Sequence, residues 1–298
     1  MDEQAAGDLR RAISLYEATL ADYVRVLGED HPTTLTSRNK LASAYASAGD
    51  PGQAMALFKA NLAARTRVLG EDHPDTLTSR NNLAYAYKSV GYLGQAISLY
   101  EANLAARTRV LGEDHPDTLN SRNNLAGAYA SAGDLERAIP LHEANLAAQT
   151  RVLGEDHPDT LNSRNNLASA YASAGAPERA IPLHEANLAA QTRVLGEDHP
   201  NTLTSRNNLA YAYKSASDLR RAIPLYEANL AARTRVLGED HPDTLVSQYN
   251  LASAYESASD LRQAIPLYEA NLAAYVRVLG EDHPLTRSVR SHLESVAG

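Results

Sequence analysis

The clearest pattern of hydrophobic and polar positions lies near the start of the chain, between Asp8 and Gly28. Apolar residues recur there every three or four positions, a spacing that gathers them on one face of an α-helix. Asp8 can accept hydrogen bonds from the free amides of a first turn, and glycine often follows the last turn of a helix, as Gly28 would. The pattern predicts one helix over residues 8–28, preceded by loose chain over residues 1–6.

The rest of the chain repeats one unit of two helices. A fixed period of this kind indicates a repeat array, in which each unit packs on its neighbours. In the unit that begins at His73 we expect an A helix over residues 75–90, capped by Asp75 or Thr76, and a B helix over residues 93–111. Each unit begins with a His-Pro pair that returns every 42 residues, at His31, His73, His115, His157, His199, His241 and His283.

The period divides the chain into one continuous all-α array over residues 1–298. Residues 8–28 form a B helix without an A helix, residues 31–282 form six 42-residue helix pairs, and residues 283–298 form a last A helix. In this last helix Glu294 stands where earlier units have a small alanine, such as Ala84. A carboxylate is costly at a tight helix contact, so we expect the last helix to cap the array against solvent.

The unit resembles the tetratricopeptide repeat. Leu83, Ala84 and Tyr87 on the A helix, with Ala96 and Tyr100 on the B helix, match the spacing of that signature. The period is longer than the usual length of about 34 residues because the B helix is longer. The segments NNLAYAY and RVLGEDHPDT are similar to the kinesin light chain type of this repeat, which also occurs in bacterial proteins, including the sensor parts of STAND-type ATPases. The resemblance implies a right-handed α-solenoid whose A helices line a concave, protein- or peptide-binding face.

Composition narrows the classes of function. The formal net charge is -8 and basic residues form no run, which argues against nucleic acid or an anionic membrane as a partner. Cysteine is absent, which excludes disulfides and thiolate chemistry and suits a reducing compartment. No apolar segment approaches the length of a membrane span, and no signal-peptide pattern occurs. We therefore expect a cytoplasmic protein.

A column of asparagines is the first candidate for ligand binding. Helical phase puts the Asn82 position on the face of the A helix opposite Leu83 and Ala84, where the groove is expected. A carboxamide offers both a donor and an acceptor, so stacked copies can bind the backbone of an extended peptide, a role that the resemblance also implies. The alternative is that each asparagine fixes a neighbouring helix or loop. The column consists of Asn82, Asn124, Asn166, Asn208 and Asn250.

Two aromatic and cationic pairs would give such a groove selectivity. Tyr85 with Lys88, and Tyr211 with Lys214, lie on the same helix faces as the asparagines. Gly127 and Ser169 hold the Tyr85 position in the units between, which leaves room for an acidic or aromatic side chain of a ligand. Ordinary surface variation remains the alternative, since exposed tyrosines are common at interfaces without being diagnostic.

Two other polar columns fall on helix faces that should be packed. An arginine recurs beside the Tyr87 position of the A helices, and an asparagine replaces a small residue of the B helices. We expect these side chains to hydrogen-bond to each other between helices and to fix the inter-repeat register, with ligand binding by the arginines as the alternative. The two columns are Arg80, Arg122, Arg164 and Arg206, and Asn103, Asn145, Asn187 and Asn229.

The loops and histidines offer little chemistry. Each EDHP loop has potential metal ligands, but one loop supplies too few, and successive loops are too far apart to share an ion, so we expect capping and a rigid turn. His142 and His184 replace a B-helix tyrosine and are interpreted as packing variants. No catalytic triad, carboxylate pair or phosphate loop occurs at usable spacing, and we expect no cofactor and no metal.

The sequence therefore favours a non-enzymatic scaffold that binds a protein or an extended peptide segment. We expect a monomer. The alternative is a self-assembling solenoid, in which the unpaired helix at one end of a copy completes the unit at the other end of the next. An enzyme is the least favoured class.

Overall fold

The computed structural model describes residues 3–297, and every secondary-structure element within them is a helix. Each 42-residue repeat supplies an A helix of 16 residues and a B helix of 19 residues, as in α4 and α5. Many consecutive helices pack against each other, as α4 does against α5 and α12 against α13. In chain order the helices are α1 (Glu3–Leu27), α2 (Pro32–Ser47), α3 (Pro51–Leu69), α4 (Pro74–Ser89), α5 (Leu93–Leu111), α6 (Pro116–Ser131), α7 (Leu135–Leu153), α8 (Pro158–Ser173), α9 (Pro177–Leu195), α10 (Pro200–Ser215), α11 (Leu219–Leu237), α12 (Pro242–Ser257), α13 (Leu261–Leu279) and α14 (Pro284–Ala297).

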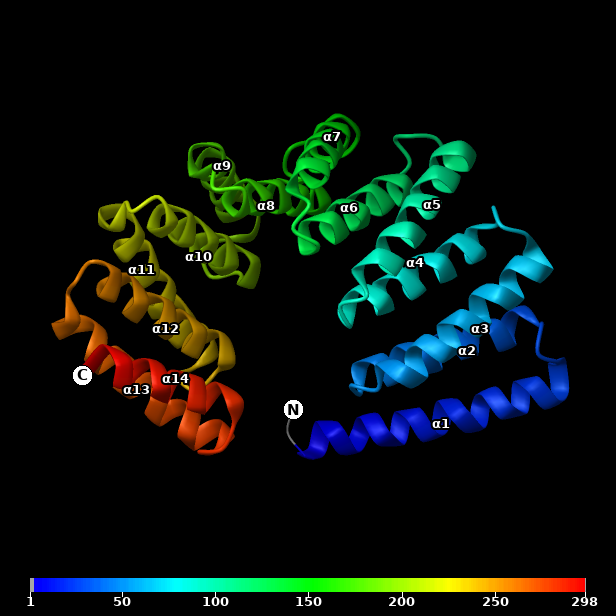
Figure 1. Ribbon diagram of the computed structural model, residues 1–298, viewed down its shortest axis with the longest axis horizontal. Helices are drawn as coiled ribbons and strands as arrows, with labels where there is room; N and C mark the ends of the chain where they lie inside the picture. The colour runs from blue at the N-terminus through cyan, green and yellow to red at the C-terminus, as the bar shows by residue number, and fades with distance from the viewer. Residues whose placement is uncertain (1–2, 298) are drawn as a thin grey trace. The chain divides into compact units, whose positions relative to one another are not determined.

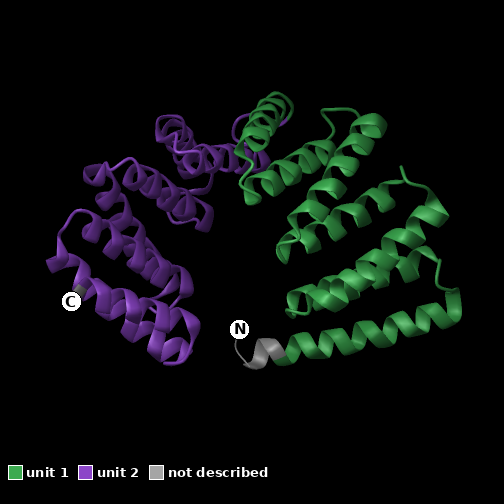
Figure 2. Ribbon diagram, in the orientation of Figure 1, with its two compact units in different colours: residues 1–152 green, residues 153–298 purple. Residues whose placement is uncertain are grey.

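The chain divides into two compact units, residues 1–152 and residues 153–298 (Figure 2). In the first unit, α2, α4 and α6 form one layer, and α3, α5 and α7 form the other (Figure 1). In the second unit, α8, α10, α12 and α14 form the corresponding layer of A helices, and α9, α11 and α13 form the layer of B helices (Figure 1). Each unit thus presents an A-helix face on one side, as expected for an α-solenoid.

The His-Pro pair starts the A helices in a way that differs from the prediction. His73 is the N-cap of α4, and its Nδ1 accepts a hydrogen bond of 3.2 Å from the amide of Asp75. Pro74 takes the first helical position, where its missing amide and fixed φ suit the helix. The proposed cap by Asp75 or Thr76 is therefore wrong, because the histidine ring reaches the free amide first.

The other ends of the helices follow the sequence more closely. The B helix over residues 93–111 was placed correctly, since α5 runs from Leu93 to Leu111. It ends at Gly112, whose φ of 89° lies in the left-handed region that other residues rarely adopt. The first helix is longer than predicted: α1 begins at Glu3, so Asp8 lies inside it. Glutamate, glutamine and alanine are good helix formers, which explains the extension over residues 3–6.

The core of each unit is built from alanines and tyrosines. In the first unit Ala84 and Ala96 are fully buried and pack with Tyr100, which is 1% exposed. In the second unit Ala210 and Ala222 pack in the same way with Tyr226. The small residues let the helices approach closely, and the tyrosine ring fills the space between them. The positions that resemble the tetratricopeptide signature are thus the positions that hold adjacent helices together.

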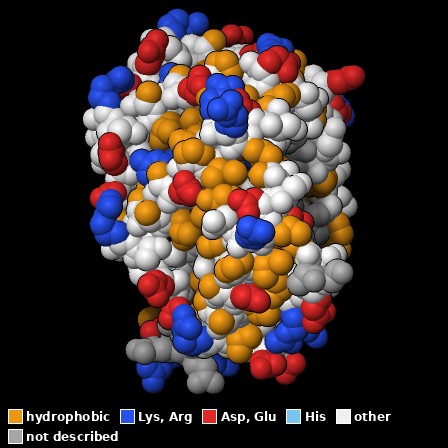
Figure 3. Space-filling view, turned by 90° about the vertical axis from the view of Figure 1, so that its left-hand side faces the viewer, with side chains coloured by type: hydrophobic (Ala, Val, Ile, Leu, Met, Phe, Trp, Pro, Cys, Tyr) orange, Lys and Arg blue, Asp and Glu red, His pale blue; other side chains and the backbone are white. Residues whose placement is uncertain are grey.

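The surface carries charges of both signs around apolar patches. Figure 3 shows one face of the molecule, on which hydrophobic side chains form a band flanked by lysine, arginine, aspartate and glutamate. Among the described residues, no helix has both the length and the apolar character needed to cross a membrane.

Candidate functional site

The asparagine column is tied together by hydrogen bonds between neighbouring A helices. In the first unit, Nδ2 of Asn124 on α6 donates to Oδ1 of Asn81 on α4 at 2.9 Å. In the second unit, Nδ2 of Asn208 on α10 donates to Oδ1 of Asn165 on α8 at 2.9 Å. Asn82 and Asn250 make the same bond, at 3.0 Å, to Asn39 and Asn207. The column therefore consists of pairs. The donor of each pair is a predicted residue, and the acceptor is the residue just before the predicted position of the preceding repeat, as Asn81 is before Asn82.

Each of these pairs keeps hydrogen-bonding capacity on the A-helix face. The bond uses one donor of Asn124 and one lone pair of Asn81. Both residues are half-buried. Oδ1 of Asn81 can still accept a hydrogen bond, and Nδ2 of Asn124 beside it can still donate one. Sequence reasoning did not foresee the pairing of Asn81 with Asn124, because the two residues are 43 positions apart.

In the first unit, Lys88 reaches over Gly127 on the next A helix. Tyr85 is 65% exposed, as predicted for a ligand-facing residue. Lys88 leans toward the next A helix, and its Nζ lies 3.3 Å from the point where a Cβ on Gly127 would be. Burial there lowers the pKa of Lys88. The lysine thus lies over Gly127, at the edge of the space expected there.

The corresponding pair in the second unit has the same arrangement. Tyr211 is 58% exposed. Nζ of Lys214 on α10 lies 2.6 Å from Oγ of Ser253 on α12. Burial lowers the pKa of Lys214, and the charge of Glu256 opposes this shift in part. Both lysines therefore reach toward a small residue on the following A helix, while both tyrosines stay exposed.

A small cavity on the A-helix face of the second unit lies beside Tyr211. It has a volume of about 150 Å³ and is lined by Ser169, Ser173, His184, Asn208 and Tyr211, with Ala172. His184 is 3% exposed, and burial lowers its pKa to about 4, so the imidazole is neutral near pH 7. Two predicted site residues thus meet around a histidine interpreted from sequence as a packing variant. The available signal was the histidine in a position held by tyrosine in other units.

The buried asparagines of the B helices have serine partners in place of the predicted arginines. Asn103 is fully buried, and its Nδ2 donates to Oγ of Ser121 at 3.3 Å. Asn187 and Asn229 make the equivalent bond to Ser205 and Ser247. Asn145 is equally buried. The arginines of the predicted column are all half-buried, whereas these asparagines are fully buried. The arginines are Arg80, Arg122, Arg164 and Arg206.

A different arginine is buried in the first unit. Arg107 on α5 is 7% exposed, and its Nη1 donates to the carbonyl oxygen of Asp117 at 2.9 Å and to Oγ of Ser121 at 3.0 Å. Burial lowers its pKa, although the charge of Asp117 opposes the shift. Ser121 therefore joins Asn103 and Arg107 in one network. The arginine and the asparagine that meet at Ser121 are thus Arg107 and Asn103.

The acidic residues of the EDHP loops make ion pairs along the array. Asp72 pairs with Arg109, and Asp198 pairs with Arg235, each across one repeat. These side chains are about half exposed or more, so each pair contributes little stability, on the order of 0–1 kcal/mol. Over the described part of the chain, no three histidine or acidic side chains gather in a way that would hold a metal ion.

The fold and its helix pairs define an α-solenoid repeat protein. A model described as tetratricopeptide repeat matches residues 1–60, 41–92, 90–144 and 123–186, and a second model with the same description matches residues 202–243 and 244–285. The chain belongs to the tetratricopeptide repeat family. No curated protein matches the sequence significantly.

Solved structures agree with this assignment. Nearly identical TPR-like repeats of a kinesin light chain type protein from Podosopora anserina are 33% identical, with a TM-score of 0.63 over 70% of this chain and 98% of that chain. BtubC (BKLC) from P. vanneervenii is 24% identical, with a TM-score of 0.67 over 78% and 94%. A STAND protein with a tetratricopeptide repeat sensor from Pyrococcus horikoshii is 15% identical, with a TM-score of 0.66, and the match spans 43% of that chain. The first of these supports the kinesin light chain-like character of the repeats.

Proposed function

We propose that this protein is a non-enzymatic scaffold that binds an extended segment of a partner protein along its A-helix face. The observation that carries the proposal is the set of inter-helix asparagine pairs, such as Asn124 with Asn81. Each pair presents an acceptor and a donor next to each other. An extended peptide residue presents the complementary amide and carbonyl groups, so the pairs suit a peptide backbone whatever its side chains are.

Selectivity would come from the groups beside the asparagine pairs. Tyr85 and Tyr211 are exposed aromatic surfaces on the A-helix face. The cavity lined by His184 has a volume of about 150 Å³. One water takes up about 30 Å³ in the liquid, so this volume corresponds to several waters or to one side chain of medium size. Lys88 and Lys214 add positive charge beside the tyrosines. A segment with an aromatic residue, a polar residue and an acidic residue would use all three features.

A selection of short linear peptides from a random library tests the proposal. Peptides that bind the native protein should lose about tenfold or more in affinity, about 1.4 kcal/mol, to the Asn82→Ala and Asn124→Ala double variant. Tyr129→Phe is the matched control, because it also removes a hydrogen bond between neighbouring units, the bond from the Tyr129 hydroxyl to Glu101, and leaves the asparagines in place.

Two results would contradict the proposal. One is equal affinity of the selected peptides for the native protein and the asparagine double variant. The other is a selection in which no peptide sequence is enriched over the unselected library. A loss of affinity of the same size in Tyr129→Phe would show that inter-repeat packing, and not the carboxamides, controls binding.

A further inference from the structure

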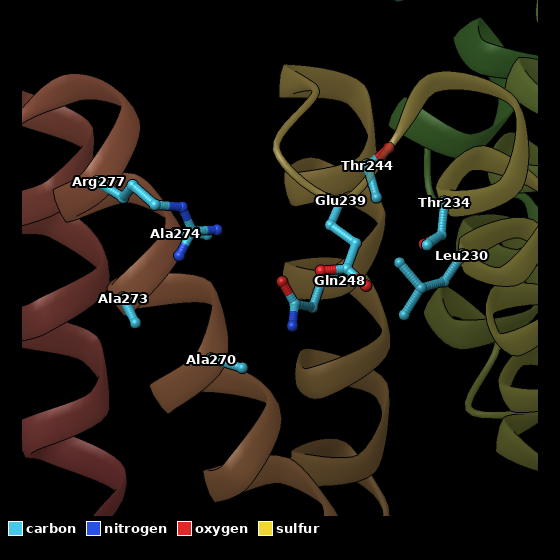
Figure 4. A pocket seen from close by; sticks show the side chains of 9 residues that line it. All are labelled: Leu230, Thr234, Glu239, Thr244, Gln248, Ala270, Ala273, Ala274 and Arg277. Carbon is cyan, nitrogen blue, oxygen red and sulfur yellow. The ribbon is translucent and has the colours of Figure 1, made fainter.

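A second cavity, of about 440 Å³, lies on the opposite side of the second unit, between α11 and α13 over α12. Its volume is in the range of about 300–1,000 Å³ that small-ligand sites occupy. Glu239, Gln248 and Arg277 direct their polar ends into the gap between α12 and α13 (Figure 4). Leu230, Ala270 and Ala273 supply apolar surface.

The cavity coincides with a break in the repeat pattern. Gln248 occupies the position that holds Arg164 and Arg206 in the preceding units and Arg290 in the following one. Glutamine is shorter than arginine and carries no charge. Its Oε1 accepts a hydrogen bond of 3.2 Å from Asn271, which holds the side chain near the floor of the cavity. The space of a guanidinium group is thus left open in this unit.

The charges around the cavity show the same gap. In the last unit, Nη2 of Arg290 lies 3.3 Å from Oε2 of Glu281, the counterpart of Glu239. In an earlier repeat of the second compact unit, the charge of Arg164 helps Arg193 to lower the pKa of Asp156. The repeat pattern therefore supplies two guanidinium groups for two loop carboxylates.

The repeat that contains Gln248 supplies only one guanidinium group to this pair of carboxylates, that of Arg277. This group pairs with Asp240, with Nε donating to Oδ2 at 3.1 Å. Within the described part of the chain Glu239 makes no hydrogen bond and no ion pair, and its contribution is a weak one that helps to raise the pKa of Arg277 after the larger effect of Asp240. The carboxylate of Glu239 at the cavity therefore lacks the guanidinium partner that Glu281 has in Arg290.

We propose that this cavity binds the guanidinium group of an arginine side chain presented by a partner protein. The guanidinium would replace the one that Gln248 lacks and would donate to the carboxylate of Glu239, since a planar fork of donors matches a carboxylate. The methylene groups of the ligand would lie on Leu230, Ala270 and Ala273, as long cationic side chains do on apolar surface. Arg277 does not exclude a second guanidinium, because neighbouring units hold two in the same arrangement.

The test uses N-acetyl-arginine methylamide as probe, with the citrulline and lysine analogues as matched ligands. Citrulline has nearly the same shape as arginine and no charge, and lysine has the charge without the fork. Titration is followed by NMR shifts of the backbone amides of Ala270 and Ala273. We expect the arginine probe to bind at least about tenfold more tightly than either analogue, the discrimination that about 1.4 kcal/mol provides.

Three variants locate the site. Gln248→Arg restores the repeat pattern and fills the cavity, so it should abolish probe binding and raise the melting temperature. Glu239→Gln should weaken the probe by about tenfold or more. Glu197→Gln removes the equivalent carboxylate of the preceding unit, where Arg206 is present, and should leave probe affinity unchanged.

The proposal is overturned if the arginine probe binds Gln248→Arg as tightly as the native protein, if citrulline or lysine binds as well as arginine, or if no shifts at Ala270 and Ala273 occur up to the solubility limit of the probe. Arginine supplied within a short peptide and free agmatine then separate the two sources of the group. Tighter binding of the peptide form supports a protein partner, and tighter binding of agmatine contradicts it. None of these outcomes bears on the asparagine pairs of the opposite face.

Discussion

Asn124 donates its Nδ2 to Oδ1 of Asn81, one repeat earlier in the first unit, at 2.9 Å. The bond has two roles in the proposed function. It fixes the spacing of neighbouring A helices, and it orients both carboxamides so that an acceptor and a donor lie side by side. Residues of both positions should therefore matter for stability and for binding.

We expect Asn81→Ala to weaken a selected peptide as much as Asn124→Ala does, although only Asn124 belongs to the column predicted from sequence. Each variant should also lower the free energy of unfolding by about 1 kcal/mol, since one hydrogen bond is lost. The two effects should not add, because both variants remove the same pair. Urea unfolding and peptide affinities of the single and double variants give this cycle. Simple additivity would show that the two side chains act independently.

The second prediction concerns Arg107, a buried cation of the first unit. Arg107→Leu removes the donation to the carbonyl of Asp117 and one of the two donors of Ser121, leaving only Asn103 there, so we expect a loss of about 2 kcal/mol in the free energy of unfolding. Arg122→Leu should cost under about 0.5 kcal/mol, as for a surface substitution, because its side chain is only half-buried. Urea unfolding measures both.

Arg107→Gln is the control for that comparison, because Gln149 and Gln191 occupy the same position in other units and are buried there. The glutamine variant should lose less stability than the leucine variant. A larger loss for Arg122→Leu than for Arg107→Leu would restore the arginine column predicted from sequence as the structural one.

How far the sequence predicts this structure depends on the range of each interaction. The bounds of α5 were predictable because glycine conformation and helix periodicity are local properties. The cap by His73 is local too, but the pattern favoured Asp75 as a common cap type. Helical phase assigns a face to Arg80, yet it does not say which neighbouring helix that face meets.

The site was harder to predict because its contacts join different repeats. The bond between Asn124 and Asn81 spans 43 positions, and its existence depends on how closely two A helices approach. The cavity beside His184 exists where imidazole replaces a phenol ring, and a volume between packed helices is not encoded in any one segment. Lys88 was predicted on the right face, but its lean over Gly127 follows from packing.

The third prediction is a loss of stability in mild acid. Burial lowers the pKa of His142 and of His184 to about 4, and the charge of Lys88 adds to the effect at His142. Between about pH 6.5 and pH 4 the unfolded chain binds a proton on each histidine that the folded chain does not bind. Stability should therefore fall as the pH falls through this window, by up to about 3 kcal/mol per histidine.

The double variant His142→Tyr and His184→Tyr isolates this contribution from that of the carboxylates. Tyrosine occupies the same position at Tyr100 and Tyr226, so the variant should fold. Its unfolding free energy, measured in urea from about pH 7 to pH 4, should depend less steeply on pH than that of the native protein. Identical slopes would mean that the histidines are protonated in the folded state.

The last prediction separates binding from stability with two tyrosines that lie two positions apart on α10. Tyr211 is 58% exposed, whereas Tyr213 is 4% exposed, and its ring lies 4.2 Å from the guanidinium carbon of Arg221. Tyr211→Ala should leave the melting temperature nearly unchanged and weaken a selected peptide by about tenfold. Tyr213→Ala should instead cost about 3–5 kcal/mol of stability, as expected for deleting a buried aromatic ring.

The two variants are informative only as a pair, because a destabilised array also binds less well. Calorimetry gives the melting temperatures, and peptide affinities are measured at a temperature where both variants are folded. If Tyr211→Ala binds as the native protein does, the exposed ring has no part in the groove. The carboxamide pairs would then act without the aromatic surface beside them.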